Sequence, residues 1–353
     1  MRIGIIGLPN VGKSTLFNAL TRSFAAKASN YPFCTVDPNV GVVEVPDTRL
    51  SAIAEIVKPA TVIPATVEFV DIAGLVRGAS KGEGLGNAFL SHIREVHAIC
   101  HVLRGFSGDD VIHVEGSVNP ARDRETVEME LALADLVTVK KRISTIEGAS
   151  RTGSKEKQQE LEVLRKLEEA LQEGLPAFEA PPDLHLLTVK PVIYVLNISE
   201  TQLKSFSPEQ ARVQLKLPAT SQVIGISAKI EEDLQNLSTD DTAAFLQELG
   251  VASSGLDQLI RAAYALLGYL TFFTAGPKEV RAWTITKGMT APEAAGVIHS
   301  DFQRGFIAAE TIAFENFVGF RGEQGSREAG KLRTEGKAYV VQDGDVLHVR
   351  FNV

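Results

Sequence analysis

The chain has 353 residues, of which 44% are hydrophobic and 23% charged, as expected for a globular protein of two or three domains and not for a disordered or collagen-like chain. Its 44 acidic and 36 basic residues give a net charge of −8, which excludes a polycation that binds nucleic acid over its whole surface. There are only two cysteines, and no leader precedes the first motif, so we expect a cytoplasmic protein. The longest apolar stretch, Ala262 to Ala275, is shorter than the roughly 20 residues of a membrane span, so no membrane partner is expected.

In the N-terminal part, short β-branched segments alternate with helical or glycine-rich stretches. This pattern is typical of βαβ units around a mostly parallel sheet and predicts an α/β fold. The predicted strands are Arg2 to Ile6, Val40 to Val45, Thr66 to Val70, Ala98 to Leu103, Pro191 to Leu196 and Gln222 to Ile226.

Residues 125–174 interrupt this pattern with two helical periodicities separated by a polar tract. The first helix would carry Val127, Leu131, Ala134 and Thr138 on one face, and the second would carry Leu164, Leu167 and Leu171. We therefore predict an inserted antiparallel helical arm. From residue 140 to residue 166 it holds eight basic and four acidic residues, so it is either a basic contact surface or an ordinary solvated helix pair.

The C-terminal part changes character again at about residue 276. A helix is predicted to end near Leu270, followed by a strand from Glu279 to Thr286, a helix from Ala291 to Gln303, and two short strands around Asp343-Gly-Asp345 within residues 338–353. These elements suggest a small β-grasp module. The predicted division is therefore an α/β domain of residues 1–124 and 175–275, the arm of residues 125–174, and the C-terminal module of residues 276–353.

The segment Gly7-Leu-Pro-Asn-Val-Gly-Lys-Ser14 fits the phosphate-binding pattern G-x-x-x-x-G-K-[ST], between a predicted strand and the helical run Thr15 to Thr21. Its glycines let the backbone wrap closely around phosphates, Lys13 offsets charge on the β and γ phosphates, and Ser14 offers an oxygen to Mg²⁺. The nucleotide contacts expected in this loop are Asn10, Val11, Gly12, Lys13, Ser14 and Thr15.

Two further segments predict a nucleotide switch. Asp71-Ile-Ala-Gly74 follows a strand, where the aspartate would hold the metal through water and the Gly74 amide would meet the γ phosphate. Thr35 lies in a proline-bracketed loop between the two motifs and would complete the Mg²⁺ ligands Ser14, Thr35 and Asp71. The glycine-rich segment after Gly74 suits a nucleotide-dependent conformational change.

The base-reading position departs from guanine-specific proteins. These proteins place N-K-x-D after a buried strand, whereas this chain has Asn197-Ile-Ser-Glu200, without the lysine or the aspartate. Loss of guanine selectivity follows from these residues, but a preference for adenine does not. The segment Ser227-Ala228-Lys229, after the next strand, would line the other side of the base.

These motifs, with the continuation Leu-Val-Arg-Gly-Ala-Ser-Lys-Gly-Glu-Gly-Leu-Gly-Asn87 and the tail segment Lys278-Glu-Val-Arg-Ala-Trp-Thr-Ile285, resemble the YchF (Obg-like) ribosome-binding ATPases over essentially the whole chain. The resemblance implies a P-loop G domain, a coiled-coil arm and a C-terminal TGS domain. It also implies that Asn197, Ile198 and Glu200 contact adenine, and that members bind the ribosome and its large subunit and act in translation or the stress response.

The resemblance also bears on catalysis. Leu75 stands where Ras-like enzymes have a water-orienting glutamine, and similar proteins are proposed to use a histidine that corresponds to His113. A structural role for His113 is the alternative. Asn10 resembles an asparagine that binds K⁺ in related NTPases, for which an ordinary turn role is the alternative.

Three functions remain in competition on the sequence. The first is a slow ATP-hydrolysing switch that contacts rRNA or ribosomal protein, with ATP and Mg²⁺ as ligands and with no DNA partner. The second is a GTP-dependent, Obg-type assembly or signalling switch. The third, a metabolic enzyme such as a kinase, is disfavoured because we find no acceptor pocket with a base.

Overall fold

The computed structural model describes residues 1–25, 39–72, 85–106, 117–149, 155–251 and 253–352. The chain forms two compact units, one of Met1–Val42 and Glu68–Leu259 and the other of Val43–Val67 and Ile260–Val353. This division differs from the predicted boundary at residue 276, because residues 260–275 and the early segment 43–67 both pack in the second unit. None of the helices in the described ranges is long and apolar enough to cross a membrane.

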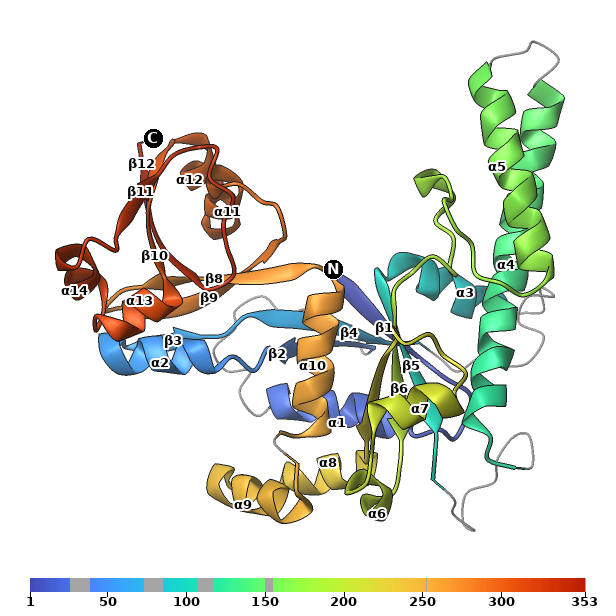
Figure 1. The fold of residues 1–353 in the computed structure, drawn as a ribbon, viewed down its shortest axis with the longest axis horizontal. Coiled ribbons are helices and arrows are strands. Elements are labelled where there is room, and N and C mark those ends of the chain that lie inside the picture. The colour runs from blue at the N-terminus through green and yellow to red at the C-terminus, as the bar shows by residue number, and fades with distance from the viewer. Residues whose placement is uncertain (26–38, 73–84, 107–116, 150–154, 252, 353) are drawn as a thin grey trace. The chain divides into compact units, whose positions relative to one another are not determined.

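The first unit is built on a six-stranded sheet with the order β2-β4-β1-β5-β6-β7 (Figure 1). Its strands are β1 (Arg2–Ile6), β2 (Val40–Glu44), β4 (Thr66–Asp71), β5 (Ala98–Arg104), β6 (Val192–Asn197) and β7 (Gln222–Ile226). The pairs β4-β1, β1-β5, β5-β6 and β6-β7 are all parallel, so the carboxyl ends of these five strands share one edge. Every strand predicted for this unit is present, and the α/β class is confirmed.

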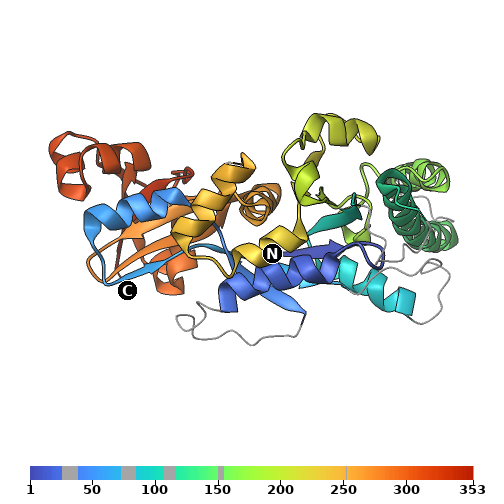
Figure 2. The same cartoon turned by 90° about the horizontal axis from the view of Figure 1, so that it is seen from below.

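Helices cover both faces of this sheet. In Figure 2, α1 lies on one side of the sheet and α7 lies on the other. On the α7 side, Tyr194, Leu196 and Val223 from the strands pack against Ala211 and Leu215 from the helix. The helices of the unit outside the arm are α1 (Lys13–Ala25), α3 (Leu85–Glu95), α6 (Glu200–Leu203), α7 (Pro208–Gln214), α8 (Ala228–Leu234), α9 (Thr239–Leu249) and the first part of α10 (Gly255–Leu266).

The predicted arm is present as a pair of long helices, α4 (Pro120–Ala149) and α5 (Lys155–Gln172) (Figure 1). It begins earlier than residue 125, because Pro120 occupies the first helical position and the Asn119 side chain accepts a hydrogen bond from the Arg122 amide at 3.1 Å. The predicted α5 face is correct, since Leu164, Leu167 and Leu171 are fully buried. On α4, however, this core is formed by Ala132, Val139, Ile143 and Ile146, a different stripe from the predicted one.

A buried carboxylate holds the chain that returns from the arm. Asp135 of α4 is 0% exposed and accepts hydrogen bonds from the Leu187 amide at 2.8 Å, the Thr188 amide at 2.8 Å and the Thr188 hydroxyl at 2.8 Å. Leu184 and Leu186, just before these donors, belong to the core of the arm. The return segment is therefore fastened to α4 by both apolar packing and hydrogen bonds.

The second unit has its own six-stranded sheet, with the order β11-β10-β12-β8-β9-β3. Its strands are β3 (Thr61–Ile63), β8 (Tyr269–Ala275), β9 (Glu279–Thr286), β10 (Phe306–Ala313), β11 (Arg333–Glu335) and β12 (Asp345–Phe351). The remaining helices are α2 (Thr48–Val57), α11 (Ala291–Ile298), α12 (Ser300–Arg304), α13 (Phe314–Gly319) and α14 (Glu323–Glu328).

Three sequence predictions for this unit need correction. The helix α10 ends at Leu266 instead of near Leu270, and strand β8 follows. The predicted helix from Ala291 to Gln303 is two helices, because His299 is extended (φ −160°, ψ 142°). Of the two strands predicted around Asp343-Gly-Asp345, only β12 forms, while Val340 makes one isolated bridge to Thr290.

Glu231 is a buried acid that links two helices of the first unit. It lies on α8, is 4% exposed, and its Oε1 accepts a hydrogen bond from the Gly255 amide at the start of α10 at 2.7 Å. Burial raises the pKa of Glu231 to about 7 although these backbone hydrogen bonds oppose the shift. Glu231 is therefore a titratable group near neutral pH in the folded protein.

We expect the free energy of unfolding to fall as the pH rises from about 5 to about 8, because the folded-state pKa of Glu231 lies above that of the unfolded chain. The protonated carboxyl is favoured by folding, and this contribution is lost as the pH rises through the folded-state pKa. The loss should be about 3 kcal/mol, from about 1.4 kcal/mol for each unit of pKa. Urea unfolding at several pH values should show that Glu231→Gln removes this dependence, whereas the exposed neighbour variant Glu232→Gln keeps it. The same pH slope in wild type and Glu231→Gln would contradict the assignment.

Candidate nucleotide-binding site

The phosphate-binding loop lies between β1 and α1, as the sequence predicts. Gly7 has no room for a side chain, since a Cβ would lie 2.6 Å from the Val102 carbonyl oxygen. Asn10 and Gly12 have positive φ angles of 64° and 93°, so the loop turns back sharply before the helix. The side chain of Val11 is 1% exposed, so this part of the loop is packed into the core. The helix α1 begins at Lys13 and has no acidic residue in its first turn, so its N-terminal amides suit an anionic ligand.

Lys13 and Asp71 bring charge to this end of the sheet. Their side chains form an ion pair, with 11% of the lysine and 20% of the aspartate side chain exposed. Asp71 ends β4 directly beside Ile5 of β1, and its own amide donates to the Asn39 carbonyl at 2.8 Å. Ser14, next to Lys13, is exposed. A hydroxyl and a carboxylate are hard oxygen donors of the kind that Mg²⁺ prefers, so the described part of the predicted metal site fits the ion.

Asn197 joins the two halves of the predicted nucleotide site. It ends β6, is 6% exposed, and its Nδ2 donates to the Val11 carbonyl at 3.0 Å while its Oδ1 accepts from the Ala228 amide at 3.2 Å. A Cβ on Gly12 would collide with the same amide group. The described geometry therefore makes Asn197 a clamp between the phosphate loop and the Ser227-Ala228 turn, with both polar atoms of its side chain engaged by protein.

The other predicted base-reading residues differ in their exposure. Ile198 is 4% exposed and packs in the apolar cluster beside α7, whereas Glu200 is exposed in the first turn of α6. Ser227 and Ala228 are both buried, and Ser227 is the N-cap of α8. In the segment Asn197-Ile-Ser-Glu200, the exposed Glu200 carboxylate is therefore available to a ligand.

Two residues that are not predicted from the sequence, Gly105 and Gln202, support this loop. The Gly105 amide donates to the Asn197 carbonyl at 2.8 Å, and Gln202 Nε2 donates to the Gly105 carbonyl at 3.1 Å. Gln202 is also the partner of Ser199 in a capping box. The Ser-x-x-Gln spacing is a readable signal for that box, but the contact with Gly105 depends on pairing between β5 and β6 and has no local signal.

Three predicted site residues, Thr35, Gly74 and His113, lie outside the described residues, as does Leu75. Among the predicted residues that the structure describes, Val11, Gly12, Lys13, Asp71, Asn197 and Ala228 are linked by the contacts above, and Asn10, Ser14 and Thr15 are their neighbours in the loop and the first turn of α1.

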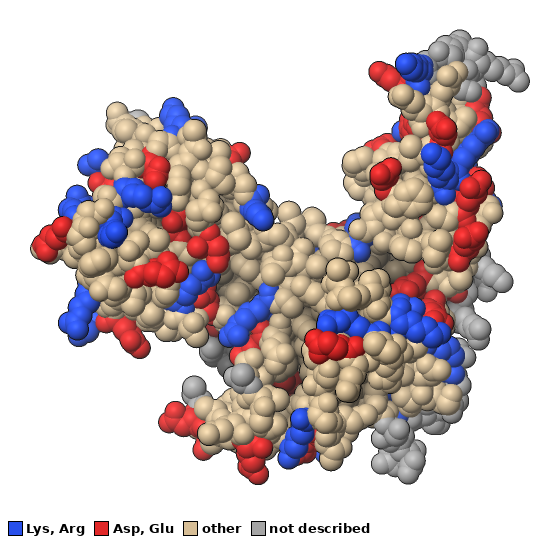
Figure 3. Space-filling view, viewed as in Figure 1, with Lys and Arg blue, Asp and Glu red and all other residues tan. Residues whose placement is uncertain are grey.

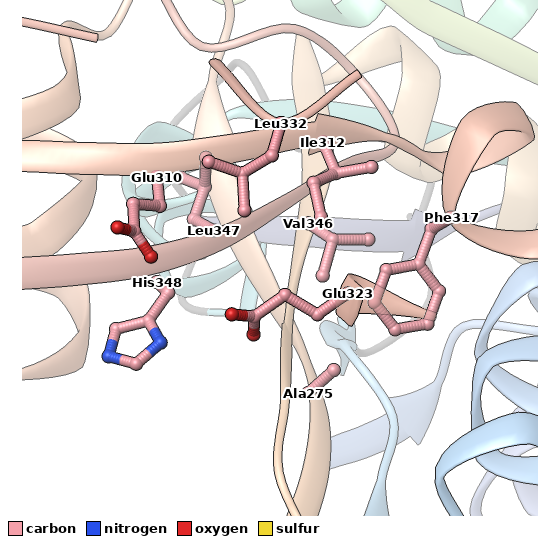
Figure 4. Close-up of a pocket in the computed structure, with 9 residues that line it drawn as sticks. All are labelled: Ala275, Glu310, Ile312, Phe317, Glu323, Leu332, Val346, Leu347 and His348. Atoms are coloured by element: carbon pink, nitrogen blue, oxygen red, sulfur yellow. The ribbon is translucent and has the colours of Figure 1, made fainter. Parts of the chain in front are cut away.

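A second group of possible metal ligands lies in the second unit. Glu310 of β10, His348 of β12 and Glu323 of α14 point toward one another, with ligand atoms within 4.8 Å (Figure 4). Arg327 contacts Glu310 at 3.3 Å and Glu323 at 2.9 Å, and Arg350 lies 3.7 Å from Glu310. Two arginines thus already balance the two carboxylates, and the cluster is better described as an ion-pair network than as a metal site.

Family models match both parts of the chain. Residues 2–147 match a family described as "50S ribosome-binding GTPase". Residues 269–352 match the family YchF-GTPase_C, described as "Protein of unknown function".

Full-length relatives and a solved structure agree with these matches. The chain is 54% identical to the ribosome-binding ATPase YchF of Bacillus subtilis, covering 99% of both chains, and 51% identical to that of Haemophilus influenzae, covering 100% of this chain and 99% of the relative. The structure of the Schizosaccharomyces pombe YchF GTPase matches with a TM-score of 0.88 and 37% identity, covering 99% of this chain and 97% of that one. A GTP-binding protein of Pyrococcus horikoshii shares the fold, with a TM-score of 0.56.

Proposed function

This chain belongs to the YchF family of ribosome-binding ATPases, and from that premise we propose that it is an ATP-hydrolysing molecular switch that binds the ribosome. The observation that carries the proposal is the pairing of an intact phosphate loop with Asn197-Ile-Ser-Glu200 in place of a guanine-reading motif, clamped together through Asn197. We place its action in the cytoplasm, on the ribosome and its large subunit, in translation or the stress response.

The chemistry is hydrolysis of ATP by water to ADP and phosphate. The N-terminal amides of α1 and the loop around Gly12 bind the phosphates, and Lys13 exchanges part of its contact with Asp71 for the β and γ phosphates. Ser14, Thr35 and Asp71 would hold Mg²⁺, which when bound neutralises the charge that develops on the phosphates. The Gly74 amide meets the γ phosphate. His113 orients the attacking water, which in Ras-like enzymes is the role of a glutamine at the position of Leu75. Turnover is slow without a partner, since Leu75 supplies no polar group.

The remaining assignments follow the family. We propose a G domain for the first unit, a coiled-coil arm for α4 and α5, and a TGS domain for the C-terminal part. For Asn10, the positive φ of 64° supports the turn role, and K⁺ activation is proposed only as a secondary role of the same residue.

The first test concerns the nucleotide base. Glu200→Ala is expected to bring ATP and GTP affinities together, with ATP binding weakened about tenfold, because the exposed carboxylate would accept a hydrogen bond from the adenine amino group. Titrating fluorescent ATP and GTP analogues measures both affinities. The matched control is Glu209→Ala, another exposed glutamate at the start of a serine-capped helix, which should change neither affinity.

Equal affinities of the wild-type protein for ATP and GTP would contradict this base-reading assignment and favour a GTP-dependent switch of the Obg type. A swap of Ile198 for lysine is a poor test, because the side chain is 4% exposed within an apolar cluster and an uncompensated lysine there would destabilise the fold.

The second test concerns the ribosome contact. Acidic and basic side chains are interleaved along the arm (Figure 3), and Arg142 and Arg165 are paired with Glu160 and Glu147. Lys155 and Lys157 are exposed at the start of α5 and form no ion pair with another described residue, so they can meet phosphate groups. We call these two lysines, together with Arg151 from the sequence between α4 and α5, the tip cluster, and we propose that it contacts rRNA.

Reversing the tip cluster with Arg151→Glu, Lys155→Glu and Lys157→Glu should weaken ribosome co-sedimentation and lower the slope of log affinity against log salt by about 2 to 3, at roughly one unit for each phosphate group that the arm no longer binds. ATP affinity should not change. The control reverses three exposed charges of the second unit, Arg321, Lys331 and Lys337, and so produces the same change in net charge. Equal losses in both triple variants would mean that total charge, and not the tip cluster, governs binding.

A further inference from the structure

A hollow of about 500 Å³ is formed entirely by residues of the second unit. This volume lies in the range of small-ligand sites. Its walls come from four places: the turn that leads into α2, one face of α10, the start of β8, and Asp343 in the loop before β12. None of the residues predicted for the nucleotide site lines it.

Most charges around this hollow are compensated by protein. Arg49 donates to Asp47 at 2.7 Å and to Asp343 at 2.7 Å, and Asp343 also accepts from the Thr271 amide at 2.8 Å. These contacts hold the α2 turn and the Asp343 loop in place. They leave little capacity for a charged ligand at this side of the hollow.

Arg261 is the exception. Its Nε donates to the Pro46 carbonyl at 3.1 Å, which fixes the direction of the guanidinium, and it forms no ion pair with any described residue. The side chain is exposed at the mouth of the hollow. An oriented guanidinium with free terminal nitrogens is suited to a phosphate or carboxylate group.

Two tyrosines supply an aromatic wall beside it. Tyr264 follows Arg261 by one helical turn, and its ring lies 5.1 Å from that of Tyr269. The Tyr264 hydroxyl is held by the Leu270 carbonyl at 3.1 Å and the Thr271 hydroxyl at 2.9 Å, so this ring is fixed. Tyr269 is half-buried and lines the hollow with its neighbour Leu270. Aromatic faces of this kind stack with planar rings.

We infer that this hollow binds a planar aromatic ligand with one anionic group, of the size of a nucleoside monophosphate, with the ring against Tyr269 and the phosphate on Arg261. The ligand is either a free mononucleotide or one nucleotide of single-stranded RNA. The RNA source rests on the proposed ribosome function, whereas the free nucleotide does not.

The test is calorimetric titration with AMP and, separately, with a short single-stranded RNA. It uses Glu200→Ala protein, which lacks the proposed adenine contact of the nucleotide site, alongside wild type. Adding Arg261→Glu should weaken AMP binding at least about tenfold, as expected for loss of a charge-assisted hydrogen bond and its replacement by repulsion. Tyr269→Ala should weaken it by several-fold. The control Arg321→Glu, an exposed arginine of the same unit, should leave it unchanged.

RNA binding that competes with AMP and disappears with Arg261→Glu identifies the RNA source, and AMP binding without RNA binding identifies the free nucleotide. Equal AMP affinity with and without Arg261→Glu, or no saturable binding of either probe, would overturn the proposal. ATP hydrolysis of the Arg261→Glu single variant shows that it is folded. Because hydrolysis and ribosome co-sedimentation are measured separately, failure of this pocket is distinguishable from failure of the proposed function.

Discussion

Replacing Lys13 with alanine is expected to lower kcat/KM for ATP by about 10³-fold, the largest effect of any single substitution that we expect on activity. Lys13 is the charge that meets the β and γ phosphates, and such preorganised contacts are worth about this much when charge develops in the transition state. Its removal also leaves the Asp71 carboxylate, now without its ion-pair partner, facing a polyanion. Steady-state phosphate release measures the fall in kcat/KM. Nucleotide titration shows how much of that fall comes from weaker ATP binding.

The control is Lys166→Ala. Lys166 is an exposed lysine of α5 in the arm, and its loss should change kcat/KM by less than about threefold, as is usual for an exposed charge that makes no contact with the reacting group. A fall of less than about tenfold in Lys13→Ala would contradict the assignment of the phosphate loop as the site of hydrolysis.

The largest expected effect on stability is at Asp135. Asp135→Ala should lower the free energy of unfolding by about 3 to 5 kcal/mol, because it leaves the donors at Leu187 and Thr188 buried without an acceptor. Asp135→Asn keeps one acceptor oxygen and should lose only about 1 to 2 kcal/mol. Urea unfolding gives the difference, and amide exchange at Leu187 and Thr188 should accelerate in the alanine variant.

Asp183→Ala is the control for this substitution. Its carboxylate is 59% exposed and pairs with Arg142 at 3.2 Å in the same return segment, so its removal should change stability by less than about 1 kcal/mol. If Asp135→Ala were no more destabilising than Asp183→Ala, the buried carboxylate would not be what fastens the segment.

The first unit could be predicted well from the sequence because its signals are local. Each strand is a short β-branched run, and the phosphate loop carries its own glycines, lysine and serine between a strand and a helix. The apolar run from Ala262 to Ala275 has no such clear signal, since a buried helix and a buried strand read alike. Gly268, with a φ of 68°, separates them: α10 ends before it, and the β-favouring residues from Tyr269 form β8.

Other parts depend on contacts between distant residues. The break at His299 is stabilised when its Nδ1 accepts from the Asp301 amide at 3.2 Å and so begins a new helix. At the site, the sequence identified Asn197 as important and assigned it to the base. Its bridge from Val11 to Ala228 joins three segments that only the sheet brings together, and no spacing along the chain encodes it.

The assignment of residues 43–67 to the second unit has a consequence for the order in which the chain is made. Strand β3 pairs with β9, with Thr61 opposite Glu279, so an edge of the second sheet emerges during synthesis long before the strand that receives it. The first unit is likewise interrupted by this segment, and neither unit is complete until late in translation. The buried Leu50 and Ile53 of α2 must remain without their final packing partners during that interval. A fragment cut at residues 269–352, where the C-terminal family model matches, would lack both α2 and β3, so it would contain only part of the second compact unit.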